Sequence, residues 1–190
     1  MTAKDTYHHG GLREALITEG MRQLELGEAE ISLRSLSKAA GVSPNAPYRH
    51  FADRNAFMGA LAAEGFVRFT DAFIDAGKAP GEIIALKGLG IAYLDFARRN
   101  PALYRLMFSP YGYSLDHPDC KAAAERAFGA LMGAVSAAHA SGWKPGHAPL
   151  TLALSFWSVL HGWACLSGDG LMPPGIAGAD WNDLLDAYLS

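Results

Sequence analysis

The chain has 190 residues and a formal net charge of −3; half of its residues are hydrophobic and 18% are charged. This composition permits one domain or two small ones around a sizeable core, and it excludes a globally disordered chain. The two cysteines, Cys120 and Cys165, are too few for a disulfide framework, which suits a reducing compartment. The first residues lack the apolar core of a signal peptide, so we expect a cytoplasmic location.

Helical periodicity dominates the hydrophobic pattern. Apolar residues recur three and four positions apart, and no run alternates convincingly with the period of a strand. The most apolar stretch, residues 150–166, is broken by Thr, Ser, His and Gly, and it falls short of the roughly 20 apolar residues of a membrane span. The sequence therefore predicts an all-α protein without a membrane partner.

The first expected helix covers residues 11–26, and two shorter helices follow it within residues 31–51. Ser32 is placed to cap the first of these two helices, and Gly41 follows it where a left-handed C-cap needs a residue without Cβ. Ser43 can cap the second helix, with Pro44 at its first position, where a missing N–H costs nothing. This is the layout of a helix-turn-helix, whose second helix lies in the DNA major groove.

The charge of this region agrees with a polyanionic partner. Residues 31–55 contain four basic residues and one acid, which gives a local net charge of +3 on a chain of −3. Phosphate contacts supply most non-specific affinity for DNA, so such a patch fits double-stranded DNA as a partner. A solvated helix pair with scattered cations explains the charge alone about equally well, and the caps and the glycine turn add specificity.

A known family shares these features. Residues 36–57 read LSKAAGVSPNAPYRHFADRNAF and strongly resemble the DNA-binding domain of TetR-type transcriptional regulators. Residues 7–13 and the segment FWSVLHGW at 156–163 look like a subgroup with a Trp…His-Gly signature in its C-terminal domain. The resemblance implies a three-helix DNA-binding domain over residues 1–53. It also implies a helical bundle over residues 54–190, which binds a small effector and forms a homodimer on a palindromic operator.

The resemblance and the motif together suggest a set of DNA contacts. Pro47 departs from the Leu or Ile that is usual in the family, and we expect it in the first turn of the second helix, where it is tolerated. We expect bases to be contacted by Ser43, Asn45, Ala46 and Arg49, and phosphates by Arg34, Tyr48, His50 and Arg54.

The rest of the chain predicts a helical bundle. Asp53 can cap a long helix, and Asp180 can cap the last one, whose residues Trp181, Leu184, Leu185 and Tyr188 form an apolar edge suited to dimerisation. Further helices are expected over residues 54–75, 81–99, 119–140, 150–166 and 180–189, with a short one from Pro101 and irregular connections at 109–118, 142–149 and 168–178.

Aromatic residues are frequent in the predicted bundle. Helical bundles place ligand cavities between facing helices, lined mostly by apolar groups, and a largely apolar effector would release a repressor from its operator. For any single residue, plain core packing is the commoner interpretation. The candidate effector-binding residues are Phe66, Tyr93, Phe96, Phe108, Phe128, Met132, Trp157 and His161.

An enzyme is the alternative from another functional class. His161 and Cys165 lie four positions apart, so they share one helix face and could hold a metal or pair a thiol with a base. No third ligand is evident, since the next acid, Asp169, lies beyond Gly168. We therefore expect no enzyme, no catalytic residues, no metal and no cofactor, and retain a helical metal- or thiol-dependent enzyme as the alternative hypothesis.

Overall fold

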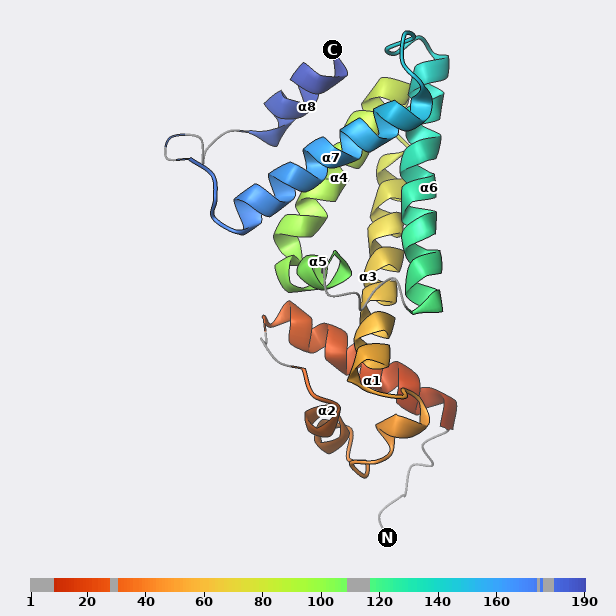
Figure 1. Cartoon of the computed structure of the whole chain (residues 1–190), viewed down its shortest axis with the longest axis vertical. Helices are drawn as coiled ribbons and strands as arrows, with labels where there is room; N and C mark the ends of the chain where they lie inside the picture. The colour runs from red at the N-terminus through yellow and green to blue at the C-terminus, as the bar shows by residue number, and fades with distance from the viewer. Residues whose placement is uncertain (1–8, 28–30, 109–116, 174, 176–179) are drawn as a thin grey trace. The chain divides into compact units, whose positions relative to one another are not determined.

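The computed structural model describes residues 9–27, 31–108, 117–173, 175 and 180–190, and these residues form helices, turns and loops (Figure 1). The predicted all-α class is confirmed, since none of the described residues lies in a strand. The elements are α1 His9–Glu25, α2 Leu33–Ala39, the 3-10 helix η1 Pro47–Arg49, α3 Arg54–Ala76, α4 Glu82–Arg99, α5 Pro101–Met107, α6 Pro118–Ala140, α7 Pro149–Gly168 and α8 Trp181–Leu189.

The chain packs as two compact units. We call residues 1–65 with 102–121 the head unit, and residues 66–101 with 122–190 the bundle unit. The long helix α3 contributes its first part to the head unit and its second part to the bundle unit. These packing units divide the chain differently from the functional domains 1–53 and 54–190, whose boundary stays a prediction.

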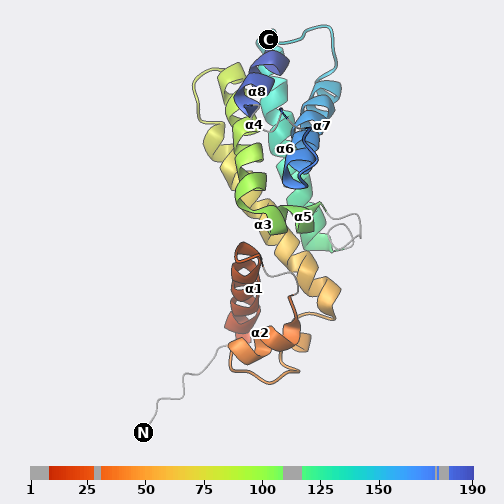
Figure 2. The ribbon, with the colours of Figure 1, turned by 90° about the vertical axis from the view of Figure 1, so that its left-hand side faces the viewer.

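The head unit is built on α1, against which α2 and η1 pack (Figure 2). Leu16, Met21 and Leu36 are at most 1% exposed, so the predicted apolar stripes of the two helices do meet in a core. Gly20 allows a close helix approach, because a Cβ there would lie 2.8 Å from Cζ of Phe57. The residues of the helix-turn-helix are therefore carried on a packed support.

Local capping signals were predicted correctly at several helix ends. The Ser32 Oγ accepts a hydrogen bond from the Ser35 N–H at 3.1 Å, and Gly41 adopts a left-handed φ of 66° after α2. Asp53 Oδ1 accepts from the Ala56 N–H at 2.8 Å, and Asp180 Oδ1 accepts from the Asn182 N–H at 2.9 Å. Most of the connection predicted at 109–118 lies outside the described residues, as does part of that at 168–178.

The second helix of the helix-turn-helix differs from the prediction. Residues 43–46 form a turn, and only Pro47–Arg49 is helical, as a 3-10 helix. The physical reason is Pro47, which has no N–H and so cannot donate to the Ser43 carbonyl as an α-helix requires. Ser43 consequently caps no α-helix here, and the expectation that Pro47 is tolerated in a first α-helical turn was wrong.

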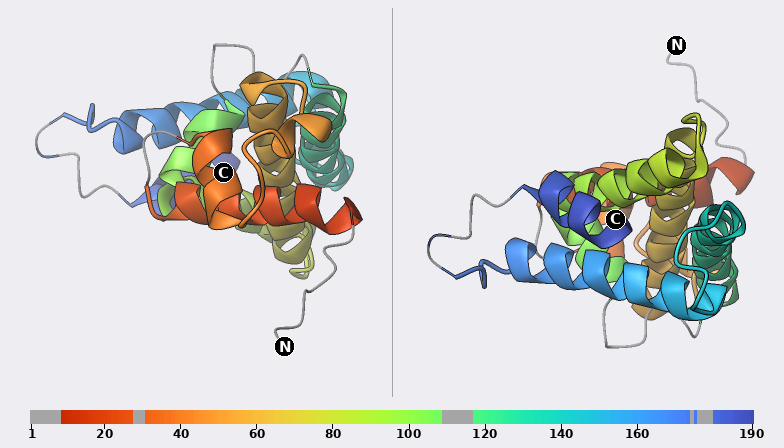
Figure 3. Two further views of the ribbon diagram at one scale, coloured as in Figure 1. Left: turned by 90° about the horizontal axis from the view of Figure 1, so that it is seen from below. Right: turned by 90° about the horizontal axis from the view of Figure 1, so that it is seen from above.

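In the bundle unit, α8 packs against α4, and its Tyr188 contacts α7 (Figure 3, right). Leu185 is fully buried, and a Cβ at Gly90 of α4 would lie 2.7 Å from its Cδ2. Tyr188 stacks on Phe156 of α7, with ring centroids 5.3 Å apart, and the Trp143 indole N–H donates to the Leu189 carbonyl at 3.0 Å. The apolar edge of α8 was predicted to face a second copy, but Leu185 and Tyr188 are used inside the protomer.

Helix α7 is strongly apolar, although much of it is not fully buried within the protomer. It has 20 residues, and it is the one helix of the described chain that is long and apolar enough, by length and composition, to cross a membrane. The sequence interpretation considered only residues 150–166, which are too short for a membrane span. Core helices of soluble proteins also reach this length and apolar composition. Only 28% of its apolar window is buried in the protomer. The remaining residues of this window are half-buried or exposed in the protomer.

Candidate nucleic-acid interface and effector site

The start of α2 is held by two serines of the head unit. The Ser32 hydroxyl lies 3.0 Å from that of Ser35, whose hydroxyl in turn donates to the Ser32 carbonyl at 2.8 Å. Together with the cap on the Ser35 N–H, these bonds fix the first turn of α2. The side chain of Arg34, which lies between the two serines in sequence, is exposed.

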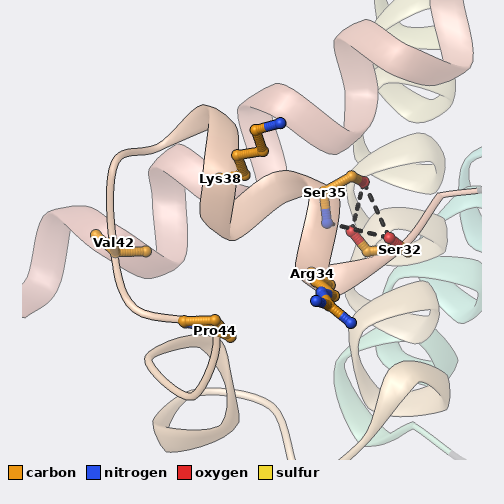
Figure 4. Close-up of a pocket in the computed structure, with 6 residues that line it drawn as sticks. All are labelled: Ser32, Arg34, Ser35, Lys38, Val42 and Pro44. Carbon is orange, nitrogen blue, oxygen red and sulfur yellow. Dashed lines mark hydrogen bonds between the residues drawn. The ribbon is translucent and has the colours of Figure 1, made fainter.

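A groove of about 450 Å³ separates α2 from the turn that leads to η1. Figure 4 shows Val42 and Pro44 across this groove from the hydrogen-bonded serines. Arg34 and Lys38 provide its charge, and its described lining includes no acid. A groove with two cations and two hydroxyls is suited to an anionic backbone. The lining residues are Ser32, Arg34, Ser35, Lys38, Val42 and Pro44.

Lys38 is a candidate that the sequence interpretation missed. It was counted in the local charge but was given no contact. A signal was present, because Lys38 follows Arg34 by four positions on one helix, and such residues share a face. Ser32 and Ser35 were likewise considered only for their helical role.

All eight predicted DNA contacts lie at the surface of the head unit. Tyr48 is 54% exposed, which leaves its ring and hydroxyl accessible to a ligand. Ala46 and His50 are half-buried. The exposed members are Arg34, Ser43, Asn45, Tyr48, Arg49 and Arg54.

Arg54 has a structural role beside its predicted phosphate contact. Its Nε donates to the Ile31 carbonyl at 3.2 Å, which ties the start of α3 to the residue before the Ser32 cap. A guanidinium has five N–H donors in a rigid fork, so one such bond leaves donors for a phosphate. Any test of Arg54 must therefore separate its effect on folding from its effect on DNA.

In the bundle unit, four of the side chains singled out above form a hydrogen-bonded chain. The Trp157 indole N–H donates to the Tyr93 hydroxyl oxygen at 3.3 Å, and this hydroxyl lies 3.0 Å from His161 Nδ1. His161 Nε2 lies 3.5 Å from the Cys165 sulfur. Tyr93 is 1% exposed, so the chain extends from the core of the unit along α7. We call it the His161 relay.

Chemistry fixes one donor in this relay. Because an indole can only donate, the Tyr93 hydroxyl accepts from Trp157, and this oxygen lies within hydrogen-bond distance of His161 Nδ1. The tautomer of the neutral imidazole decides which of its nitrogens donates, the one toward Tyr93 or the one toward Cys165. Burial lowers the pKa of His161 from its ordinary value, which favours this neutral ring.

The same arrangement opposes the enzyme hypothesis for this pair. Burial and the nearby carboxylate of Asp169 raise the pKa of the Cys165 thiol, whereas a nucleophile or metal ligand needs a thiolate. Within the described residues, no three potential metal ligands come together.

The other predicted effector residues are only partly brought together. Phe96 packs on Phe69 with ring centroids 4.9 Å apart, and Phe128 lies 5.9 Å from Trp157 in an edge contact. Phe66 is buried, and Met132 is half-buried. Phe108 belongs to the head unit, where it packs on Tyr104 at 4.8 Å.

A hollow of the bundle unit lies away from these residues. It encloses about 470 Å³ between α3, α4 and α6, and Glu82 is its one charged residue among those described. Small side chains of α6 form one wall, including Ala130, Gly133 and Ala137. None of the eight predicted effector residues lines it, and the predicted effector site stays a prediction.

Comparison with solved structures supports the fold. A protein of unknown function from Rhodococcus sp. RHA1 is 29% identical and superimposes with a TM-score of 0.79, with 97% of this chain and 94% of that chain covered. The TetR family transcriptional regulator PfmR from Thermus thermophilus is 18% identical, with a TM-score of 0.61 over 91% of this chain and 93% of that one. The second likeness concerns the fold alone.

Sequence relatives match over a shorter length. The uncharacterized HTH-type transcriptional regulator YobS of Bacillus subtilis is 30% identical over 96 residues, which is 50% of each protein. The nucleoid occlusion factor SlmA of Haemophilus ducreyi is 32% identical over 90 residues, 46% of this chain and 44% of the relative. The chain thus spans about half the length of the curated relatives it matches.

The C-terminal part of the chain shows which protein family it belongs to. Residues 86–190, more than half of the chain, match the tetracyclin repressor-like C-terminal domain. This match confirms the family, although the Trp…His-Gly signature of the predicted subgroup stays a prediction. By its C-terminal domain, this chain belongs to the tetracyclin repressor-like, or TetR, family.

Proposed function

We propose that this protein is a homodimeric transcriptional regulator that binds double-stranded DNA through its head unit and represses until a small effector releases it. The observation that carries the proposal is the groove beside α2. It places Arg34 and Lys38 next to the exposed turn and 3-10 helix of a helix-turn-helix. Cations positioned beside such a motif are suited to the phosphates that flank a major groove.

The predicted contacts take two roles in this proposal. Ser43, Asn45, Ala46 and Arg49 lie on the exposed turn and on η1, where a major groove can reach them. Phosphates are assigned to a second set, which positions the protein without reading sequence. This set comprises Arg34, Tyr48, His50 and Arg54 from the predictions, with Lys38 added from the groove.

The test is the salt dependence of binding to a labelled duplex of about 30 base pairs. Each neutralised phosphate contributes about −0.9 to the slope of log K against log salt concentration. We expect Arg34→Ala and Lys38→Ala each to flatten the slope by about one unit. Lys78→Ala is the control, because Lys78 is an exposed lysine of the bundle unit that pairs with Asp75. Equal slopes in the wild type and all three variants would contradict the proposed interface.

Dimerisation is proposed on α7. Leu150 and Leu154 lie four positions apart on one face and are 52% and 44% exposed, on a helix most of whose apolar window is unburied. A two-fold dimer would bring two recognition segments, residues 43–50 of each copy, to a palindromic site. We expect Leu154→Glu to yield monomers in sedimentation velocity, while Ile84→Glu, at an apolar position on α4 that is 61% exposed, stays dimeric. A dimeric Leu154→Glu would place the interface elsewhere.

The effector is proposed to be small and largely apolar, and to bind at the α7 face that carries Trp157 and His161. These side chains bring an indole and an imidazole beside Phe128 and the Tyr93 hydroxyl. A ligand shifts the DNA-bound state only by its differential affinity for the two states.

The double variant Trp157→Ala, His161→Ala tests this site. Lost release with unchanged DNA affinity supports the effector site. Equal loss of release and of DNA affinity, with a lowered melting temperature, means that this face is structural.

A further inference from the structure

The hollow between α3, α4 and α6 has apolar walls and an open rim. Phe73 of α3 and Leu89 of α4 line it and are at most 3% exposed, so they form its floor. Ile74 also lines it, but this side chain is 55% exposed and lies at the rim. The volume of about 470 Å³ is within the range of roughly 300–1,000 Å³ that small-molecule sites occupy. The hollow can therefore hold a small ligand on an apolar floor.

Helix α6 contributes only small side chains to this hollow. They are those of Ala130, Gly133, Ala134 and Ala137. A Cβ built at Gly133 would meet no atom within 4 Å, so no neighbouring helix requires a glycine there. Inside a helix, glycine is less favourable than alanine. The sequence thus leaves open a space that a larger side chain could fill.

One charged side chain lines this apolar space. Glu82 lies in the first turn of α4, and its carboxylate makes no ion pair or side-chain hydrogen bond within the part of the chain that the structure describes. Lys78, four positions earlier, is already paired with Asp75 at 2.6 Å. The helix dipole accounts for a carboxylate in a first turn, but it does not account for the apolar space beside it.

We propose that this hollow is a second ligand site, which binds a small amphipathic amine. The apolar body of the amine covers Phe73, Ile74 and Leu89, and its ammonium group pairs with the Glu82 carboxylate. Charge complementarity selects this class, because the lining contains a carboxylate and no cation among the described residues. An acidic ligand would bring a second negative charge beside Glu82. The site is separate from the proposed effector site, and the proposal does not rest on DNA binding.

The test compares three probes of equal chain length, octylamine, octanol and octanoate, in calorimetric titrations of the full-length protein at pH 7. Octylamine, which is protonated at this pH, should bind about two- to fivefold more tightly than octanol, as expected for a pair of charges at an exposed rim. Octanoate should bind most weakly. Each methylene added between hexylamine and octylamine should strengthen binding roughly fourfold, because it is buried on the apolar floor.

Three variants separate the charge from the space. Glu82→Gln keeps the shape of the rim, so it should abolish the preference for octylamine and leave the affinity for octanol unchanged. Gly133→Leu fills the hollow and should weaken binding of octylamine and octanol by about tenfold or more. Gly129→Leu is the matched control, because a Cβ there also meets nothing within 4 Å and Gly129 does not line the hollow. Circular dichroism verifies that each variant is folded.

The outcomes are distinct. If octylamine does not bind the wild type, if Gly133→Leu binds it as tightly as the wild type does, or if Gly129→Leu weakens it equally, then the hollow is not the site. If Gly133→Leu abolishes binding but Glu82→Gln keeps the preference for octylamine over octanol, then the assignment of an amine to Glu82 is overturned. The proposed function is tested separately by the salt slope of DNA binding.

Discussion

The recognition segment and the His161 relay differ in the distance along the chain over which their geometry is set. In the helix-turn-helix, the bonds that shape α2 and η1 join residues three or four positions apart, such as Ser32 with Ser35. In the bundle unit, Tyr93 and His161 are separated by 68 positions, and Trp143 and Leu189 by 46. One site is organised by local chemistry, and the other depends on the packing of whole helices.

This difference has a consequence for mutational sensitivity. Exposed residues of the recognition segment can be changed with little effect on stability, so their loss should be visible mainly in DNA binding. Residues of the relay and of the α8 contact are buried or half-buried, so their loss should be visible first in folding. The predictions below test this separation, from the largest expected effect to the smallest.

The largest effect is expected at Leu185, which α8 buries fully against α4. Leu185→Ala should lower the free energy of unfolding by about 2–5 kcal/mol, since it removes buried methyl groups and leaves a cavity. Urea denaturation followed by circular dichroism measures this change. The matched control is Leu171→Ala, because Leu171 is 65% exposed and should change stability by less than about 0.5 kcal/mol.

This result bears on how dimerisation is tested. A chain that lacks α8 would lose the Leu185 and Tyr188 contacts within its own protomer, so its failure to dimerise would not identify an interface. If Leu185→Ala is as stable as Leu171→Ala, then α8 is not a structural part of the bundle unit, and removing it becomes an informative experiment.

The second effect is expected from Tyr93→Phe. This change removes the hydroxyl to which the Trp157 indole N–H donates and which lies beside His161 Nδ1. Leaving the half-buried Trp157 and His161 without this partner should lower the free energy of unfolding by about 1–3 kcal/mol. Tyr48→Phe, at a tyrosine that is 54% exposed, is the comparison for stability. If the two changes alter the free energy of unfolding equally, then the hydrogen bonds of the relay make no specific contribution to stability.

The pH dependence of stability tests the charge state of His161. Burial lowers its pKa in the folded protein below the ordinary value of 6.5, so the unfolded chain takes up the proton first as the pH falls. The stability is fully present above about pH 6.5 and declines below it, until the folded ring is protonated too. We expect a smaller decline between about pH 7.5 and 5.5 in His161→Gln, measured by urea denaturation. Parallel declines would show that His161 is not the titrating group.

The same contrast explains which parts of the fold could be predicted from sequence. The caps at Ser32, Asp53 and Asp180 and the left-handed Gly41 each act within a few residues, so composition and spacing identify them. The long helices follow from apolar periodicity. The packing of α8 could not be predicted, because a hydrophobic face does not specify whether its own chain or a second copy covers it.

The candidate sites show the same limit. The exposure of the predicted DNA contacts agrees with the motif, but a single residue, Pro47, changed the helix type, since its missing N–H was weighed only for an α-helical first turn. Lys38 was overlooked although its spacing from Arg34 was visible. The bond from Tyr93 to His161 joins two helices, so sequence could indicate the residues but not their hydrogen bond.

The smallest effect concerns Arg54, which combines a structural and a proposed functional role. It donates a hydrogen bond to the Ile31 carbonyl, and it is a proposed phosphate contact. Arg54→Ala should flatten the salt slope of DNA binding by about one unit, uniformly over different sequences. Arg54→Lys keeps the charge but loses the guanidinium fork, so it should retain most of the slope while losing the bond to Ile31. Fluorescence anisotropy at several salt concentrations gives the slope, and urea denaturation of the same proteins gives the stability. If Arg54→Lys and Arg54→Ala share one flattened slope and one loss of stability, then Arg54 acts only by holding the start of α2, and it leaves the list of phosphate contacts.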